Sequence, residues 1–281
     1  MYSHPIINQV ALTVKDLERV MTFYQEQLGF QVIDQTTNRA VLSADGKNGL
    51  LILEENKNAK LRAPYSTGLY HIAFLLPHRS DLANLVHHFI QKQIPVQGAS
   101  DHDVSEALYL ADPEGNGIEI YIDRSPDTWT WNGDQVYMTT KALDIEDLLK
   151  EGSPNGWQGM PAGTFIGHVH LQVSELTKVK QFYCDTIGFE PVLNYGGQAL
   201  FISKHRYHHN IGLNKWNSAG AEPAAENSTG LNWYSIALKN EKEMKKIVEQ
   251  LELQQISYNF NDGKLITKDP SGNYIHFIIK G

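Results

Sequence analysis

Two stretches of the chain, 6–30 and 164–189, repeat one pattern of apolar and polar positions. In each, an alternating Val-x-Leu-x-Val segment is followed by an acidic residue, an aromatic pair and a Gly-Phe pair. The matching positions are Val10 and Val169, Leu12 and Leu171, Val14 and Val173, Phe23 and Phe182, Tyr24 and Tyr183, Gly29 and Gly188, and Phe30 and Phe189. A period of two predicts a half-buried strand, and the helical spacing after it predicts an amphipathic helix that ends at the glycine.

A second pair of matching segments closes each repeat. Residues 112–119 read Asp-Pro-Glu-Gly-Asn-Gly-Ile-Glu, and residues 269–276 read Asp-Pro-Ser-Gly-Asn-Tyr-Ile-His. Self-similarity over a long period indicates repeated structural units. The chain is therefore predicted to consist of two duplicated halves, roughly 6–123 and 164–280.

Each half divides again into two smaller units. A Gly-Leu pair opens a new unit at Gly68 and again at Gly230, so that four βαβββ modules begin near residues 6, 68, 164 and 230. Asp16 or Ser174 is expected to cap the helix of its module, and the helix of the second module is expected to span Asp81 to Gln93. One helix for every three strands favours an α+β fold of curved mixed sheets over a parallel doubly wound sheet.

We expect two tandem domains, 1–123 and 164–281, joined by a connection over 124–163. Modules one and two would form the first domain, and modules three and four the second. The connection is rich in Gly, Pro, Ser, Thr and Trp, which is typical of irregular structure. A short helix from Leu143 to Leu149 is predicted inside it.

Composition and charge restrict the location and the partners. The net charge of −8 disfavours a nucleic-acid-binding surface, which needs clustered Lys and Arg. Cys184 is the single cysteine, which excludes an intramolecular disulfide and a thiolate metal cluster. The sequence shows no secretion signal and no run of about 18 apolar residues that would predict a membrane-spanning helix. We therefore expect a cytoplasmic protein in a reducing setting.

The modules and motifs described above resemble the vicinal-oxygen-chelate superfamily, which includes glyoxalase I, fosfomycin-resistance proteins and type I extradiol ring-cleaving dioxygenases. Four modules on one chain of 281 residues are most similar to the two-domain catechol 2,3-dioxygenase-like members. The resemblance covers nearly the whole chain and implies curved sheets that form cups. It does not imply one substrate, because this scaffold hosts isomerases, transferases, dioxygenases and binding proteins.

The resemblance also implies where metal ligands lie: on the first strand of a module and at the end of the Asp-Pro-x-Gly-Asn motif. The candidates are Gln9, His71, His168 and either Trp233 or Tyr234 on first strands, with Glu119 and His276 at the motif ends. Only modules two and three together supply two histidines and a carboxylate, His71, Glu119 and His168, a set that suits a non-haem ferrous ion. Pairing modules one with two and three with four would leave each cup one ligand short. We therefore predict that modules two and three pair.

Three further residues are expected to take part in catalysis, by similarity to extradiol enzymes. Tyr109 lies ten residues before Glu119, the spacing of a substrate-binding tyrosine in those enzymes. His102, on the predicted strand before Tyr109, is a candidate acid or base. Of the neighbours His208 and His209, His209 is preferred as the proton-handling histidine because of the same similarity. An ordinary histidine pKa of about 6.5 suits proton transfer from a catechol.

These residues lead to one expected function and two alternatives. The expected function is ring cleavage of a catechol-like aromatic diol by O2, with Fe(II) or Mn(II) as the metal. A glyoxalase-type lyase or isomerase would instead use Ni(II) or Zn(II) and a carboxylate base, without O2. The third reading is a metal-free protein that binds a small aromatic compound or drug. The sequence predicts no nucleic-acid or membrane partner and leaves open whether the chain forms a homo-oligomer.

Overall fold

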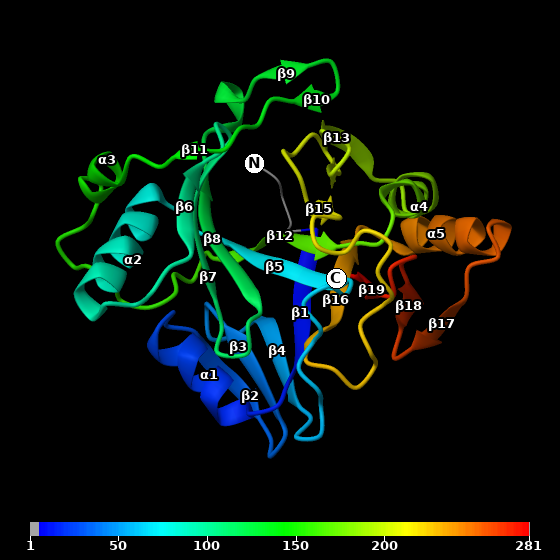
Figure 1. Ribbon diagram of the computed structural model, residues 1–281, viewed down its shortest axis with the longest axis horizontal. Helices are drawn as coiled ribbons and strands as arrows, with labels where there is room; N and C mark the ends of the chain where they lie inside the picture. Colours follow the sequence, from blue (N-terminus) through cyan, green and yellow to red (C-terminus); the bar gives the residue numbers. More distant parts are fainter. Residues whose placement is uncertain (1–5, 281) are drawn as a thin grey trace.

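The computed structural model describes residues 6–280 and contains the four predicted modules (Figure 1). Module one contains β1 (Ile7–Val14), α1 (Leu17–Glu26), β2 (Gln31–Gln35), β3 (Arg39–Ser43) and β4 (Gly49–Glu55). Module two contains β5 (Gly68–Leu75), α2 (Arg79–Lys92), β6 (Gly98–Asp101), β7 (Ser105–Ala111) and β8 (Gly117–Asp123). Module three contains β12 (Phe165–Gln172), α4 (Leu176–Lys180), β13 (Glu190–Tyr195), β14 (Ala199–Ser203) and β15 (Ile211–Asn214). Module four contains β16 (Gly230–Leu238), α5 (Glu241–Leu253), β17 (Tyr258–Asn261), β18 (Lys264–Lys268) and β19 (Tyr274–Ile279).

Two mixed sheets combine these modules across the halves of the chain. One has the strand order β17-β18-β19-β16-β1-β4-β3-β2 and holds modules one and four; we call it the 1/4 sheet. The other, the 2/3 sheet, has the order β11-β6-β7-β8-β5-β12-β15-β14-β13 and joins modules two and three through antiparallel β5 and β12. The predicted pairing of modules two and three is therefore confirmed. The domain boundaries at residues 123 and 164 stay a prediction. They divide the sequence into its two repeats, whereas each sheet contains strands from both repeats.

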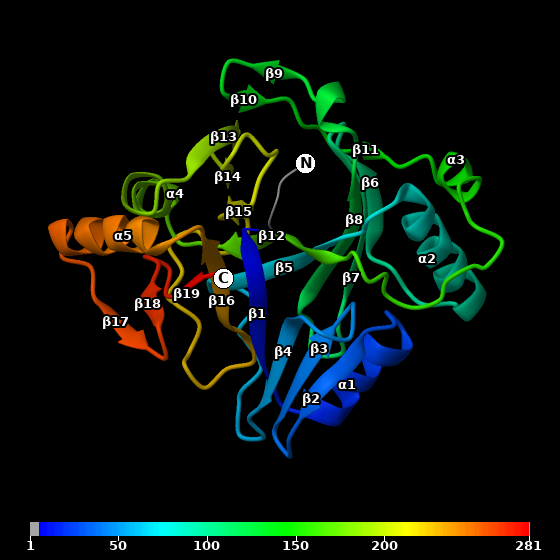
Figure 2. The same ribbon diagram turned by 180° about the vertical axis from the view of Figure 1, so that it is seen from behind.

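The helices lie on the outer side of the sheets, as the views from both sides show for α1, α2 and α5 (Figures 1 and 2). Apolar side chains at alternate positions of the first strands are fully buried in one core, for example Val10 and Leu12 of β1 and Val169 and Leu171 of β12. Burying each such side chain stabilises the fold by roughly 1.5–3 kcal/mol. Side chains at the intervening positions are left for the concave faces. No helix within residues 6–280 is both long enough and apolar enough to cross a membrane.

The predicted helix start agrees with the structure at α1, and those of α4 and α2 differ from it. Asp16 caps α1, where its side chain accepts a hydrogen bond from Arg19 N, as predicted. The prediction for Ser174 was wrong. Its backbone N–H donates to Ser271 Oγ, and the residue that precedes α4 is Glu175, whose side chain makes no capping bond. Helix α2 begins two residues before the predicted Asp81.

The Asp-Pro-x-Gly-Asn motif forms a loop that connects neighbouring modules. Asp112 accepts hydrogen bonds from both the backbone and the side-chain nitrogen of Asn116, which closes the loop. Glu114 of the same loop accepts from Lys15 N and Asp16 N at the start of α1. The second copy, 269–273, closes in the same way. The motif therefore holds the modules of one half together, while the sheets join the two halves.

The connection between the halves packs along the 2/3 sheet. It contains a 3-10 turn (Pro126–Thr128), β9 (Trp131–Asn132), β10 (Gln135–Val136), β11 (Lys141–Ala142) and α3 (Ile145–Leu149). Strand β11 pairs with β6, and the β9–β10 hairpin reaches module three, where Gln135 Nε2 donates to Pro191 O. Trp129 is buried, and its ring packs against Tyr207 and His208. Helix α3 lies within the predicted range 143–149. The connection thus runs beside the 2/3 sheet, with β9 and β10 at the top of Figure 1 and α3 at its left.

Candidate metal centre

Two rows of side chains cross the concave face of the 2/3 sheet. The first row, from β12 to β7, is His168, Ala73, Glu119 and Tyr109. The second row, from β12 to β8, is His170, His71 and Gly117. Because residues two apart on a strand share a face, both rows point to the same side of the sheet. Ala73 and Gly117 add little bulk, so the longer side chains can converge over them.

A β-bulge at Gly167 precedes His168. The register between β12 and β5 shifts between Ile166 and His168, and the register of β1 shifts at the equivalent place, just before Gln9. A Cβ atom at Gly167 would collide with the Tyr121 hydroxyl, so only glycine fits there. Bulges of this kind re-aim the neighbouring side chain. The bulge therefore turns His168 into the cup, and the glycine leaves room for the Tyr121 hydroxyl.

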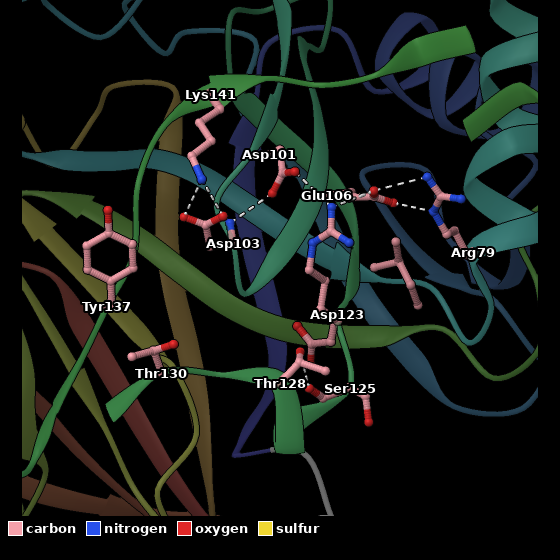
Figure 3. A pocket seen from close by; sticks show the side chains of 12 residues that line it. Arg79, Asp101, Asp103, Glu106, Asp123, Ser125, Thr128, Thr130, Tyr137 and Lys141 are labelled. Carbon is pink, nitrogen blue, oxygen red and sulfur yellow. Dashed lines mark hydrogen bonds and ion pairs between the residues drawn. The ribbon is translucent and has the colours of Figure 1, made fainter. Parts of the chain in front are cut away.

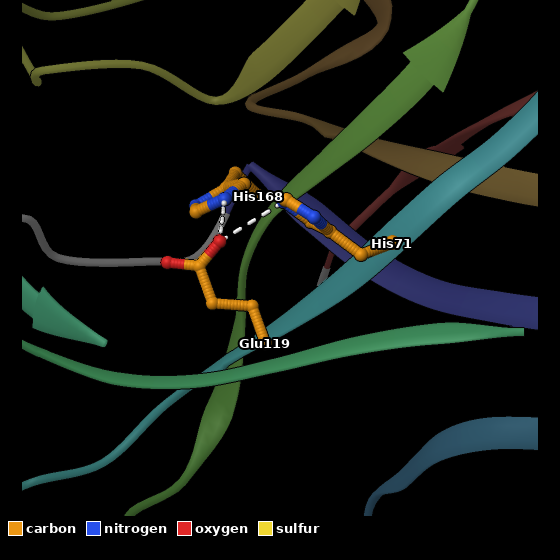
Figure 4. Close-up of side chains that lie close together, drawn as sticks. All are labelled: His71, Glu119 and His168. Atoms are coloured by element: carbon orange, nitrogen blue, oxygen red, sulfur yellow. Dashed lines mark hydrogen bonds and ion pairs between the residues drawn. The ribbon is translucent and has the colours of Figure 1, made fainter. Parts of the chain in front are cut away.

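His71, Glu119 and His168 point toward one another from three strands (Figure 4). Glu119 Oε2 lies 2.9 Å from His71 Nε2 and 3.2 Å from His168 Nε2. One ligand atom of each residue lies within 4.8 Å of the other two, and all three residues are buried. The structure thus brings together the three ligands predicted from the sequence, two from one half of the chain and one from the other.

The chemistry of this set fits a divalent metal. Burial lowers the pKa of His168 to about 4, which leaves a neutral ring with a free lone pair near neutral pH. Burial alone would raise the pKa of Glu119, but the opposing imidazoles outweigh it and hold the pKa well below 4.5. His71 Nε2 is buried and, among the described residues, has no hydrogen-bond partner, because its contact with Glu119 is not aligned as a hydrogen bond. A bound cation would satisfy this nitrogen and the buried carboxylate together.

A cavity of about 720 Å³ opens over the three residues. Its aromatic wall comes from both modules and consists of Tyr70, Tyr109, Tyr195, Phe201 and Trp216. Residues 138–140 of the connection form another side. No lysine or arginine of the described chain lines this cavity. An apolar wall around a small polar group is the usual form of a small-molecule site.

His102 and Tyr109 are hydrogen-bonded to each other in the wall of the cavity. His102 follows directly after β6 instead of lying on the strand. Its Nδ1 lies 2.6 Å from Thr139 O, and because a carbonyl only accepts, Nδ1 carries the hydrogen. In the neutral ring, Nε2 then accepts from the Tyr109 hydroxyl at 2.7 Å. Burial, helped by the charge of Glu119, raises the pKa of Tyr109 well above 10, so the phenol stays protonated.

The structure gives the neighbours His208 and His209 different surroundings, in the loop before β15. His209 lines the cavity, and its ring centroid lies 4.1 Å from that of His168. His208 is fully buried, and its Nε2 lies 2.8 Å from Asp123 Oδ1. This placement agrees with the choice of His209 as the residue that faces a substrate. The expected ordinary histidine pKa does not hold, because burial lowers the pKa of His209 well below 6.5. Its catalytic role stays a prediction.

The cavity also contains residues that the sequence did not single out. His170 is buried, with its ring centroid 5.1 Å from that of Tyr70 and 5.5 Å from that of Trp216. Its Nε2 contacts Asn214 Nδ2 at 3.1 Å. The alternation along β12 places His170 on the same face as His168, although it assigns His170 no role, and His170 lines the cavity. Tyr70 and Trp216 gave no such signal, since they meet only through the pairing of modules two and three.

A second cavity, of about 710 Å³, lies where β6 and β8 end and β7 begins (Figure 3). Its wall is mainly charged. Glu106 is buried and pairs with both Arg79 and Arg124. Asp123 also lines this cavity. It contacts His208, which lies on the side of the three candidate ligands.

Sequence comparison finds relatives over nearly the whole chain. A model of the Glyoxalase/Bleomycin resistance protein/Dioxygenase superfamily matches residues 6–120. The catechol-2,3-dioxygenase of Bacillus subtilis (strain 168) is 45% identical over 277 residues, which are 97% of this chain and 97% of that protein. Biphenyl-2,3-diol 1,2-dioxygenase 3 of Rhodococcus globerulus is 30% identical over 165 residues, which are 53% of this chain and 85% of that protein.

Solved structures share the fold. A Bacillus subtilis protein aligns with a TM-score of 0.69 and 12% identity over 97% of this chain and 84% of its own. Glyoxalase I of Zea mays aligns with a TM-score of 0.59 and 13% identity over 97% of this chain and 92% of its own. At such low identity these alignments concern the fold alone.

Proposed function

The chain belongs to the glyoxalase/bleomycin resistance protein/dioxygenase superfamily, and from this premise we propose that it is a metal-dependent, extradiol-type dioxygenase that cleaves the ring of a catechol-like diol. Similarity to a catechol-2,3-dioxygenase over 97% of the chain supports the reaction class. The observation that carries the proposal is the buried set of His71, Glu119 and His168 beneath an aromatic cavity. We expect the enzyme to work in the cytoplasm.

We assign Fe(II) to these three residues, with Mn(II), Zn(II) and Ni(II) as the alternatives. Two neutral imidazoles and one carboxylate are the ligand set typical of non-haem Fe(II) oxygenases. When bound, the metal would supply Lewis acidity and a path for electrons from the diol, which is oxidised, to O2, which is reduced. Because the ligands must be deprotonated, the lowered pKa values of His168 and Glu119 prepare the site for the cation near neutral pH.

The surrounding side chains would bind the diol and move its protons. His209 stands against His168 in the cavity wall, where it can take a proton from a substrate hydroxyl and return it later. Tyr109, held by His102, would orient the diol through its hydroxyl group. The aromatic wall would pack against the substrate ring and exclude water.

The lining of the cavity favours an uncharged catechol. A carboxylate on the substrate would find no lysine or arginine partner among the described lining residues. A hydrogen bond to a charged group contributes about 1.5–3 kcal/mol. We therefore expect kcat/KM to be roughly 10- to 100-fold higher for catechol and an alkyl catechol than for 3,4-dihydroxybenzoate.

An oxygen electrode tests the function directly. The chain is purified without oxygen, loaded with Fe(II) and given catechol. We expect O2 uptake together with a yellow ring-cleavage product. A protein that binds Ni(II) or Zn(II) and isomerises a hemithioacetal without O2 would be a glyoxalase-type enzyme instead. Metal-loaded protein that consumes no O2 with any catechol would contradict the proposal.

A further inference from the structure

Asp123, His208 and His209 form a hydrogen-bonded chain that ends beside the candidate metal ligands. His208 Nε2 lies 2.8 Å from Asp123 Oδ1, and His208 Nδ1 lies 2.8 Å from His209 Nδ1. His208 is 0% exposed and His209 8% exposed. Their nitrogens therefore bond to each other and to the carboxylate instead of to bulk water.

The carboxylate determines the direction of these hydrogen bonds. A carboxylate only accepts, so His208 Nε2 carries a hydrogen. A neutral His208 ring then has a lone pair on Nδ1, which accepts the hydrogen of His209 Nδ1. His209 in turn has no hydrogen on Nε2. Because His209 lines the main cavity and its Nδ1 is occupied, the lone pair on Nε2 is offered to the cavity.

We propose that Asp123 and His208 are positioning residues that fix the tautomer and ring orientation of His209, so that His209 Nε2 accepts a proton from the substrate. The proton acceptance rests on the proposed function, whereas the tautomer does not. A carboxylate that holds a catalytic histidine in one tautomer is a known device in enzymes, and its loss lowers kcat strongly. In this protein a second imidazole stands between the carboxylate and the histidine that faces the cavity.

The surroundings hold this chain of residues in place. The Tyr207 hydroxyl donates to the same Asp123 Oδ1 at 3.2 Å, and the Trp129 ring centroid lies 5.1 Å from that of His208. The loop that delivers the histidines turns through two non-glycine residues with positive φ, His205 at 60° and Arg206 at 57°. Such a conformation costs on the order of 1–3 kcal/mol per residue and persists only where the surroundings enforce it.

Nitrogen-15 NMR of the full-length chain, labelled at histidine, reads the tautomers without substrate or added metal. The chemical shift of each ring nitrogen shows whether it carries a hydrogen. We expect a hydrogen on Nδ1 alone in His209 and on Nε2 alone in His208. A doubly protonated His208, or a His209 protonated on Nε2, would overturn the proposal whether or not the protein is a dioxygenase.

Kinetics of the iron-loaded enzyme test the consequence. In His208→Phe and in Asp123→Ala we expect kcat to fall roughly 10- to 100-fold, with KM for catechol changed less than about threefold and the iron content unchanged. Asp123→Asn should lower kcat as well, because the amide NH2 can donate to His208 Nε2 and so reverse the tautomers of both rings. The control Tyr207→Phe removes the other hydrogen bond to Asp123 Oδ1 and the one between the Tyr207 and Tyr121 hydroxyls. It leaves the contact between Asp123 and His208 intact and should keep kcat within about threefold.

Two kinetic results would contradict the proposal. One is full kcat in both His208→Phe and Asp123→Ala. The other is an equal loss in Tyr207→Phe, which would assign the effect to packing. If the wild-type enzyme cleaves no catechol, the proposed function fails, and the NMR measurement still decides the tautomers.

Discussion

The 2/3 sheet and the 1/4 sheet present equivalent positions filled by different side chains. The row His168, Ala73, Glu119 and Tyr109 corresponds in the 1/4 sheet to Gln9, Ser235, His276 and Ile266. The row His170, His71 and Gly117 corresponds to Ala11, Trp233 and Tyr274. The central strand pairs, β1–β16 and β12–β5, also have register shifts at the same two equivalent positions. The duplicated backbone is therefore common to both sheets, and the side chains differ.

The 1/4 sheet uses these positions for packing. Trp233 stacks on His276, with ring centroids 4.4 Å apart and planes 18° apart. Gln9 Nε2 donates to Gly49 O at 2.9 Å. The adjacent apolar cluster contains Ala11, Val41, Ile52 and Trp233. The comparison teaches that this backbone supplies a geometry, and that three side chains decide whether the geometry can hold a metal.

The largest contrast is expected between Glu119 and its equivalent, His276. Glu119→Ala should lower kcat/KM for catechol by at least about 10³-fold, because a catalytic metal supplies several kcal/mol and each factor of ten is about 1.4 kcal/mol. His276→Ala should keep kcat/KM within about twofold, because the 1/4 sheet has no part in the proposed reaction. Initial rates of O2 uptake measure both. Equal losses would remove the functional distinction between the sheets.

Transfer of the ligand set to the 1/4 sheet would sharpen the comparison. The triple variant Gln9→His, Trp233→His and His276→Glu recreates the ligands at the equivalent positions. We expect the metal content to rise from about one to about two ions per chain, because two histidines and a carboxylate define the site. Metal analysis of the folded variant measures this number. A content that stays at one would mean that the backbones of the two sheets differ more than the strand registers indicate.

The two sheets should also respond differently to the loss of equivalent aromatic rings. Trp233→Ala should lower the free energy of unfolding by about 2 kcal/mol, since Trp233 packs against the apolar cluster. In metal-free protein, His71→Ala should cost less than about 1 kcal/mol, because it also removes a buried nitrogen without a hydrogen-bond partner. Urea unfolding of both variants gives the two values. A larger cost for His71→Ala would assign a structural role to the candidate ligands.

One histidine in each sheet should make the stability of the metal-free protein depend on pH. Burial lowers the pKa of both His168 and His276 to about 4, against about 6.5 in an unfolded chain. As the pH falls from 6.5 toward 4, these two histidines become protonated in the unfolded chain but stay neutral in the folded protein. The folded state therefore loses stability in this pH range. His276→Leu should reduce the loss between pH 7 and pH 5, measured by urea unfolding at both pH values. An unchanged loss of stability between the two pH values would show that His276 does not contribute to this pH dependence.

The smallest effect is expected in the loops that lead to equivalent strands. Before β4, Gly46 takes a positive φ of 72°, whereas before β15 His205 takes 60°. Glycine adopts this conformation without the penalty of a Cβ atom, but it also gains entropy in the unfolded chain. His205→Gly should therefore stabilise the protein by less than about 1 kcal/mol in thermal unfolding. A clear loss of stability would mean that the His205 side chain supports the loop.

Much of the site could be predicted from local sequence. Glu119 ends a loop motif, and His168 and His71 occupy first strands, so the positions implied by the family resemblance, read in each repeat, suffice to find them. The pairing of modules two and three followed from the ligand sets, and the strand order confirms it. Ser174 does not cap α4 because the helix starts one residue later, after Glu175. The backbone N–H of Ser174 donates to Ser271 Oγ, a contact with a distant residue that no local pattern reveals.

The remaining features depend on contacts between distant segments. Asp123 reaches His208 across 85 positions of the chain, and His102 reaches Thr139 across 37. The sequence could not rank His209 above His208 by physics, because their difference arises from burial and from this one carboxylate. The aromatic wall could not be predicted either, because its residues come from modules two and three and meet only in the folded protein.

Metal analysis of three proteins purified without oxygen tests the central claim most directly: the wild type, His168→Ala and the equivalent variant in the other sheet, Gln9→Ala. The account predicts about one iron per chain in the wild type and in Gln9→Ala, and almost none in His168→Ala. Full metal content in His168→Ala, or its loss in Gln9→Ala, would contradict a metal centre built by modules two and three.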